Sequence, residues 1–276
     1  MTTTLGIVAG GGHLPRQLID HCRETGRPFA LICLKGQADA DIIGDAPCLW
    51  MRMGEAGKGI EYFKKNGVGE IVMIGPVRRP SLFDLRPDWW TTKFLVKIGF
   101  KAFGDDNLLS SVIHHVESSG FKIIGIHEIM TDILASEGLF GKVRPDEQAR
   151  ADIEHGVRIA LGLGALDVGQ SVVVQQGIVL AVEAVEGTDA MIARCKGLKR
   201  EGVGGVLVKM KKPHQEQRAD LPTIGVQTVV NAYEAGLRGI AVQAGKTLIV
   251  NRPELIRKAD ELGMFIVGVT PEQGKK

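Results

Sequence analysis

Cysteine is scarce in this sequence, and its few residues are scattered. They stand at positions 22, 33, 48 and 195, and no two of them form a C-x-x-C pair. Zinc ribbons and redox-active dithiols need closely spaced cysteines, so neither class of site is indicated. We therefore expect reduced, buried thiols that take no part in chemistry.

An excess of charge of either sign is also missing. Lys and Arg number 34 against 32 Asp and Glu, which gives a net charge of +2. This balance excludes a general electrostatic attraction to nucleic acid. Any basic site in the protein must therefore be local.

Long hydrophobic runs are absent too. No window approaches the roughly 20 apolar residues that cross a bilayer. The N-terminal MTTTLGIVAGGG has no basic region, and its apolar run is too short for a signal peptide. We predict a cytoplasmic protein and leave peripheral contact with a membrane surface open.

What the sequence does contain is an alternation of apolar runs and helical patterns. In the first half, apolar runs at 5–9, 29–34, 48–53 and 70–74 predict strands, and 121–126 is the last apolar run of this half. Helical patterns follow several of them, which predicts a Rossmann-like parallel sheet with helices on both faces. A chain of 276 residues favours two domains.

The second half predicts a separate α/β domain. The glycine- and proline-containing stretch EGLFGKVRPD (137–146) is interpreted as a linker between domains at 1–136 and 147–276. Runs at 171–175 and 178–183 predict a hairpin around Gln176-Gly177. We expect the ligand in the cleft between the two domains.

Gly10, Gly11 and Gly12 join the first predicted strand to a helix. Backbone N–H groups at a helix N-terminus bind anions, so a phosphate or nucleotide fits this turn. A merely structural turn is the alternative. A nicotinamide cofactor is disfavoured, because Pro15 replaces the third glycine of the dinucleotide fingerprint and Lys35 follows the second strand where that fingerprint has an acidic residue.

A proline-containing loop follows the strand at 70–74. It carries Arg78, Arg79 and Arg86, whose guanidinium groups could hold phosphate oxygens or form a solvated cluster. Further along, Asp105 and Asp106 precede a predicted helix. They suit Mg²⁺ binding, or one of them suits a helix cap.

Acidic residues cluster where an apolar strand of the second half ends. Glu183, Glu186 and Asp189 lie in AVEAVEGTDAM, with Thr188 as the expected N-cap of the next helix. Carboxylates beside a buried strand need cations or donors nearby. A binding site or a capped, solvated helix start would each account for the pattern.

A mixed-charge loop comes next, with the sequence KMKKPHQEQRADLPTIG. Lys209 and Arg218 lie in it near the carboxylates of Glu216 and Asp220. Prolines flank these charges, so the loop either holds acid and base in a fixed relation or is a solvated surface loop.

Several runs of this sequence together resemble the LpxI-type UDP-2,3-diacylglucosamine pyrophosphatases of the lipid A pathway. These runs are IVAGGGHLP (7–15), GDDNLL (104–109), DVGQSVVV (167–174), LAVEAVEGTDAM (180–191), VLVKMKKPHQEQRADLPTIG (206–225) and GLRGIAVQAG (236–245). The resemblance covers nearly the whole chain, and the runs of the second half are its most specific part.

The resemblance implies Mg²⁺-assisted hydrolysis of UDP-2,3-diacylglucosamine to UMP and 2,3-diacylglucosamine 1-phosphate (lipid X). Peripheral contact with the inner membrane surface is compatible with such an activity. The family's Arg-x-Asp-Leu-Pro motif falls on 218–222, so its acidic residue corresponds to Asp220. The sequence departs from the family pattern at Glu216, where the pattern has Asp, and at Gln243, where it has Glu.

Pyrophosphate hydrolysis needs a carboxylate that orients or deprotonates water, and cationic side chains that hold the phosphates. It also needs a metal ion that neutralises negative charge. We expect Asp220 to bind Mg²⁺ or activate water. The expected catalytic set is completed by Glu183 and Asp189, the metal set by Glu186, Asp105 and Asp106, and the substrate-binding set by Gly10, Gly11, Gly12, Arg78, Arg79, Thr188, Lys209 and Arg218.

Two other questions stay open at this level. Trp89, Trp90, Phe94 and Phe100 could form an apolar face for acyl chains or could simply be core residues. The alternative function is a non-catalytic module that binds a sugar nucleotide or a lipid.

Overall fold

The computed structural model describes residues 3–78, 86–98 and 105–271. The chain forms two compact units. The first comprises Met1–Thr131 together with Glu216–Asp220, and the second comprises Asp132–Gln215 and Leu221–Lys276. A short segment from the second half of the sequence is therefore part of the first unit.

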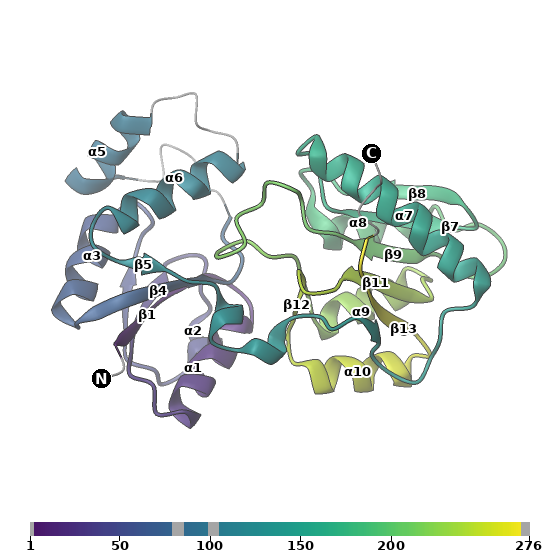
Figure 1. Ribbon diagram of the computed structural model, residues 1–276, viewed down its shortest axis with the longest axis horizontal. Helices are drawn as coiled ribbons and strands as arrows, with labels where there is room; N and C mark the ends of the chain where they lie inside the picture. The colour runs from purple at the N-terminus through teal and green to yellow at the C-terminus, as the bar shows by residue number, and fades with distance from the viewer. Residues whose placement is uncertain (1–2, 79–85, 99–104, 272–276) are drawn as a thin grey trace. The chain divides into compact units, whose positions relative to one another are not determined.

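In the described part of the first unit, the sheet has five parallel strands in the order β3-β2-β1-β4-β5 (Figure 1). The strands are β1 (Thr4–Ala9), β2 (Phe29–Leu34), β3 (Cys48–Met51), β4 (Val68–Ile74) and β5 (Lys122–Ile123). This is the strand order of a Rossmann-type sheet. The predicted Rossmann-like fold of the first half is confirmed.

Helices cover both faces of this sheet. They are α1 (Leu14–Glu24), α2 (Ala40–Ile43), α3 (Ala56–Lys65), α5 (Trp89–Ile98) and α6 (Asp105–Glu117). Phe63 of α3 and Ile113 of α6 pack with Ile32 and Ile71 of the strands in one apolar cluster. On α1, Leu18 and Cys22 lie one turn apart and are fully buried, so one apolar face of this helix is also buried in the protein.

The last apolar run of the first half, at 121–126, contains only a short strand, β5. Only β5 pairs with β4, and a 3-10 turn, η2 (Ile126–Glu128), begins soon after it. A second turn, η3 (Thr131–Ile133), follows. The run is apolar because Phe121, Ile123 and Ile124 are buried, and burial alone does not require a long strand.

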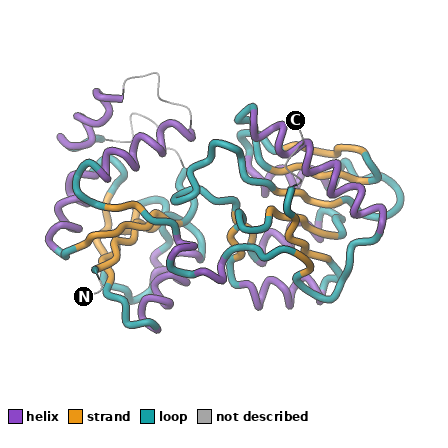
Figure 2. Tube along the Cα trace, viewed as in Figure 1, coloured by secondary structure: helices purple, strands orange, loops and turns teal. Residues whose placement is uncertain are grey.

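In the second unit, the main sheet is mixed and runs in the order β6-β13-β11-β9-β7-β8. Figure 2 draws the strands in orange and the helices in purple. Its strands are β6 (Gly138–Leu139), β7 (Ser171–Gln175), β8 (Ile178–Val182), β9 (Val206–Lys209), β11 (Gly239–Gln243) and β13 (Phe265–Val269). β9, β11 and β13 are parallel, whereas β6, β7 and β8 each run antiparallel to a neighbour. A separate parallel pair joins β10 (Thr223–Ile224) to β12 (Leu248–Ile249).

This sheet is also covered on both faces. Its helices are α7 (Glu147–Ala165), α8 (Gly187–Cys195), α9 (Val226–Glu234) and α10 (Arg252–Glu261). Ile153 and Ala160 of α7 pack against one set of strand side chains, which includes Val208. The other three helices pack against the alternate set, which includes Leu207. The alternation follows from strand geometry, because successive side chains point to opposite faces.

The stretch 137–146, interpreted as a linker, contains β6, which pairs with β13. Its last residue, Asp146, is the N-cap of α7, and its side chain accepts a hydrogen bond from the backbone N–H of Ala149 at 2.8 Å. The predicted hairpin of β7 and β8 is confirmed. Gln176 has a positive φ of 52° and Gly177 one of 77°, as a tight hairpin turn requires.

The cysteines are free thiols, as expected. Cys22, Cys33 and Cys195 are buried, and Cys48 is half-buried. Burial raises the pKa of the Cys33 thiol to about 12, so it stays protonated at neutral pH. None of the helices among residues 3–78, 86–98 and 105–271 is long and apolar enough to span a bilayer.

A buried carboxylate on α7 holds the hairpin turn. Asp152 is 0% exposed, and its oxygens accept the backbone N–H groups of Gln176 at 3.0 Å and Gly177 at 2.7 Å. Gln148 donates to the same carboxylate at 3.2 Å. The turn amides are thus satisfied by a side chain and not by water.

We expect Asp152→Ala to lower the free energy of unfolding by roughly 2–4 kcal/mol, because it leaves two turn N–H groups without their acceptor. Urea denaturation followed by circular dichroism measures this loss. Glu154→Ala on the same helix removes an exposed carboxylate and is the control, with a change of at most about 0.5 kcal/mol. Equal stabilities of the two variants would contradict the anchoring role of Asp152.

Candidate functional site

The glycine turn after β1 is a close backbone crossing. The N–H of Gly10 donates to the carbonyl oxygen of Ile74 at 2.8 Å, and that of Gly11 donates to Pro76 at 2.9 Å. A Cβ on Gly10 would lie 2.7 Å from the carbonyl oxygen of Gly75. Glycine is therefore needed at position 10 for packing alone. An anion at this turn would have to use the amides from Gly12 onward.

Arg78 lies beside this turn at the carboxyl edge of the first sheet. Its N–H donates to the Gln37 side-chain oxygen at 2.8 Å, and its carbonyl accepts from the Gln37 amide at 3.3 Å. The sequence analysis missed this tether, which fixes the backbone while the Arg78 side chain stays exposed. Arg79, also predicted to bind substrate, lies outside the described residues.

Asp105 and Asp106 are the first two residues of helix α6, whereas the sequence placed them just before a helix. Their side chains lie outside the described residues, as does the whole of Phe100. Their predicted role as metal ligands therefore stays a prediction.

A buried polar cluster occupies one edge of the second sheet. We define it as Ser171, Glu183, Thr188 and Lys209. Lys209 ends β9 and Ser171 begins the antiparallel β7, while Glu183 directly follows β8. These strand directions bring all three residues to the same edge, which is the carboxyl edge of the parallel strands, where α/β sheets bind ligands.

The hydrogen bonds of this cluster are centred on Thr188. The ammonium group of Lys209 donates to Thr188 Oγ1 at 2.5 Å, and Thr188 Oγ1 donates to Glu183 Oε1 at 2.9 Å. Ser171 Oγ lies 3.4 Å from both Lys209 Nζ and Thr188 Oγ1. The structure thus brings together three of the predicted site residues and adds Ser171, which the sequence analysis did not single out.

Thr188 is not the N-cap of α8, and that prediction is wrong. The N-cap is Glu186, and Thr188 lies in the first turn of the helix. Its hydroxyl is directed to Glu183 and Lys209 and not to a helix N–H. The direction of the Thr188 hydroxyl is set by contacts with residues at the sheet edge, and local sequence does not reveal such contacts.

Glu186 and Asp189 are exposed and stand apart from this cluster's hydrogen bonds. Glu186 accepts from Arg194 at 2.9 Å and from the N–H of Ala184 at 3.1 Å. Its own backbone N–H and then Arg194 lower the pKa of its carboxyl. Asp189 lies in the first turn of α8, as predicted, and accepts from Asn231 at 3.2 Å.

The loop after β9 is held by Gln243 at the end of β11. The N–H of Lys211 donates to the Gln243 side-chain oxygen at 2.9 Å. A glutamate in this position would offer the same kind of acceptor, so the contact does not depend on the charge of residue 243.

Arg218 ties the next part of the loop to helix α6. Its Nε and one terminal nitrogen donate to the two oxygens of Glu216 at 3.0 and 2.9 Å, and the other terminal nitrogen donates to Glu117 at 2.7 Å. The neighbouring Ala219 packs against the apolar cluster of the first unit. Each terminal nitrogen still has a second N–H, so the predicted binding of phosphate by Arg218 is compatible with these contacts.

These contacts surround Asp220 and fix its backbone. Asp220 is half-buried, and its N–H donates to the carbonyl oxygen of Glu216 at 2.8 Å. The hydrogen bonds from Arg218 lower the pKa of the Glu216 carboxyl, and Glu216 in turn raises the pKa of the guanidinium. Both groups therefore remain charged at neutral pH and hold the segment in one conformation.

The described residues hold no group of three or more His, Cys, Asp or Glu side chains suited to a metal ion. Mg²⁺ needs only one or two protein carboxylates when phosphate oxygens and water complete its shell. A single half-buried carboxylate such as that of Asp220 is compatible with this kind of binding. The carboxylate of Glu186 accepts a hydrogen bond from Arg194.

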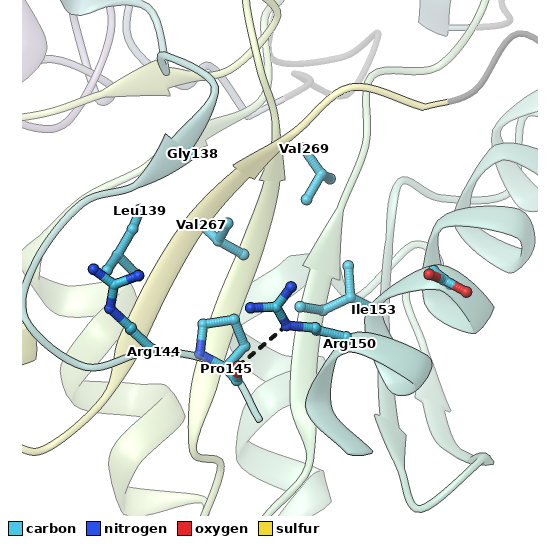
Figure 3. A pocket seen from close by; sticks show the side chains of 9 residues that line it. Gly138, Leu139, Arg144, Pro145, Arg150, Ile153, Val267 and Val269 are labelled. Atoms are coloured by element: carbon cyan, nitrogen blue, oxygen red, sulfur yellow. Dashed lines mark hydrogen bonds between the residues drawn. The ribbon is translucent and has the colours of Figure 1, made fainter. Parts of the chain in front are cut away.

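A pocket of about 370 Å³ lies elsewhere in the second unit, beside β6, β13 and the start of α7 (Figure 3). Leu139, Ile153 and Val267 line it together with two arginines, Arg144 and Arg150. Arg150 Nε donates to the carbonyl oxygen of Pro145 at 3.4 Å, drawn as the dashed line. None of the predicted site residues lines this pocket.

Comparison with known proteins accounts for nearly the whole chain. Residues 4–133 match the LpxI N-terminal domain, and residues 136–267 match the LpxI C-terminal domain. The chain is also 42% identical over 276 residues to the UDP-2,3-diacylglucosamine pyrophosphatase LpxI of Caulobacter vibrioides, an alignment that covers 98% of each protein. The resemblance found in the sequence is thereby confirmed, and the chain belongs to the LpxI family.

Proposed function

We propose that this protein hydrolyses the pyrophosphate of UDP-2,3-diacylglucosamine to UMP and 2,3-diacylglucosamine 1-phosphate (lipid X), with Mg²⁺ as cofactor. Membership of the LpxI family and the 42% identity to a pyrophosphatase of that name support this activity. The observation that carries the proposal is the placement of Asp220. Its segment is fixed to the first unit by the Arg218 ion pairs, which makes it a pre-organised carboxylate.

The proposed reaction is a displacement by water at phosphorus. The oxygen of water forms a bond to one phosphorus, and the bond from that phosphorus to the bridging oxygen breaks. Asp220 orients the water and accepts its proton, while the bridging oxygen leaves with the other phosphate. Mg²⁺, when bound, neutralises charge on the phosphate oxygens.

Cationic side chains hold the phosphates in this proposal. Lys209 ends β9 at the carboxyl edge of its parallel strands, and Arg78 is exposed at the carboxyl edge of the first sheet. Open α/β sheets bind ligands at such edges, and a cation there stabilises phosphate charge. The predicted location of the ligand between the two domains stays a prediction.

We expect Asp220→Ala to reduce the rate of UMP release in the presence of Mg²⁺ by at least about 100-fold, because it removes the proton acceptor. Asp20→Ala is the matched control, since it removes an exposed carboxylate of the first unit that pairs with Arg16. Chelation of divalent ions by EDTA should abolish release from the parent protein, and added Mg²⁺ should restore it.

Three outcomes would count against parts of this proposal. A parent protein that releases no UMP would contradict the hydrolase activity and favour a non-catalytic binding module. Equal rates for Asp220→Ala and Asp20→Ala would remove Asp220 from the mechanism. Full activity in EDTA would remove Mg²⁺ from it.

We further propose that the protein works in the cytoplasm and contacts the membrane surface through α5. Trp89 and Val96 are 73% and 78% exposed, and Lys93 lies 5.1 Å from the centre of the Trp89 ring. Trp90 and Phe94 instead pack on His115, with ring centres 4.3 and 5.0 Å away. An exposed tryptophan beside a lysine is typical of a surface that binds the interface of an anionic bilayer.

We expect Trp89→Ser to weaken binding to vesicles of anionic phospholipid at least about fivefold, measured by co-sedimentation. Leu166→Ser is the control, because it also removes a large apolar side chain that is 76% exposed. Similar binding by both variants would contradict the assignment of this surface to α5.

A further inference from the structure

The buried polar cluster of the second unit contains a hydrogen-bond chain whose direction is fixed by chemistry. A lysine ammonium has only donors, and an ionised carboxylate has only acceptors. The hydroxyl of Thr188 must therefore accept from Lys209 and donate to Glu183, at 2.5 and 2.9 Å. One hydroxyl couples a buried cation to a buried anion.

Burial makes this coupling important. Lys209 is 4% exposed and Glu183 is 6% exposed. Charged groups removed from water need compensating partners, and a lysine side chain is flexible and has no preferred direction of its own. Ser171, which is fully buried, offers Lys209 a further oxygen at 3.4 Å.

The other oxygen of Glu183 limits what this residue can do. Glu183 Oε2 is inaccessible to solvent and has no hydrogen-bond partner. Oε1 is occupied by Thr188. Neither oxygen is available to a substrate in this arrangement, so the geometry does not suit Glu183 to the role of a base toward water.

We propose that Glu183 and Thr188 are positioning residues, which act on the phosphate through Lys209. Glu183 fixes the orientation of the Thr188 hydroxyl, and Thr188 directs the Lys209 ammonium group from the end of β9. This inference rests on the proposed function. It replaces the predictions that Glu183 is catalytic and that Thr188 contacts the substrate.

The first test compares Thr188→Val with Thr188→Ser in the UMP-release assay. Valine has the shape of threonine but neither the donor nor the acceptor, whereas serine keeps both. We expect Thr188→Val to reduce kcat/KM at least about tenfold, mainly through kcat, and Thr188→Ser to stay within about threefold of the parent. Thr25→Val is the control, since its hydroxyl contacts only carbonyl oxygens at the end of α1.

A double variant separates positioning from simple structural damage. In a Lys209→Ala background, adding Thr188→Val should reduce kcat/KM by less than about a further twofold, because the ammonium group that Thr188 directs is already absent. The full tenfold loss in that background would overturn the proposal. So would parent-like activity of Thr188→Val, or failure of Thr188→Ser to retain activity. Thr188→Ala replaces Thr188→Val should the latter not fold.

A second test does not depend on activity. The rate at which acetic anhydride modifies Lys209 is measured by mass spectrometry in the folded proteins. Loss of the hydroxyl should increase this rate at least about threefold in Thr188→Val and leave it near the parent rate in Thr188→Ser. Equal rates in all three would overturn the proposal. If the parent releases no UMP, the proposed function fails, but this labelling experiment still decides whether Thr188 holds Lys209.

Discussion

The contact between Arg218 and Glu117 is the constraint on which the proposed activity depends. These residues are 101 positions apart, and their bond at 2.7 Å joins the loop that carries Asp220 to the last residue of α6. The two-point bond between Arg218 and Glu216 orients the guanidinium toward α6. Partly exposed ion pairs contribute only about 1 kcal/mol or less to stability. Their main effect here is to restrict the loop to one conformation.

A second constraint comes from the strand directions of the mixed sheet. Because β7 runs antiparallel to both β8 and β9, the start of β7 and the ends of the other two strands meet at one edge. Lys209 and Glu183 reach that edge from different strands, and Thr188 joins them from α8. The sheet thus brings a buried cation and a buried carboxylate to the edge where α/β sheets bind ligands.

Much of the fold follows from local pattern. The strands Phe29–Leu34 and Ser171–Gln175 have the predicted bounds, because apolar periodicity and flanking turn residues coincide there. β5 is shorter than its apolar run, because buried residues outside a strand give the same pattern. Local pattern therefore identifies elements better than it identifies their ends.

The site was predicted less completely, for a physical reason. Lys209, Glu183 and Thr188 were found because charged and polar residues interrupt apolar runs. Ser171 was predicted only as the first residue of a strand, and Glu117 was not singled out from the sequence. Their importance arises from contacts across 38 and 101 positions, which no local pattern encodes.

The most direct test of this account is the rate of UMP release by Glu117→Ala. This variant leaves Asp220 in place but removes the carboxylate that anchors Arg218, so we expect kcat to fall at least about tenfold. Glu61→Ala, which removes an exposed carboxylate of α3, should retain the parent rate. A folded Glu117→Ala protein with the parent rate would contradict the claim that this contact positions Asp220 for catalysis.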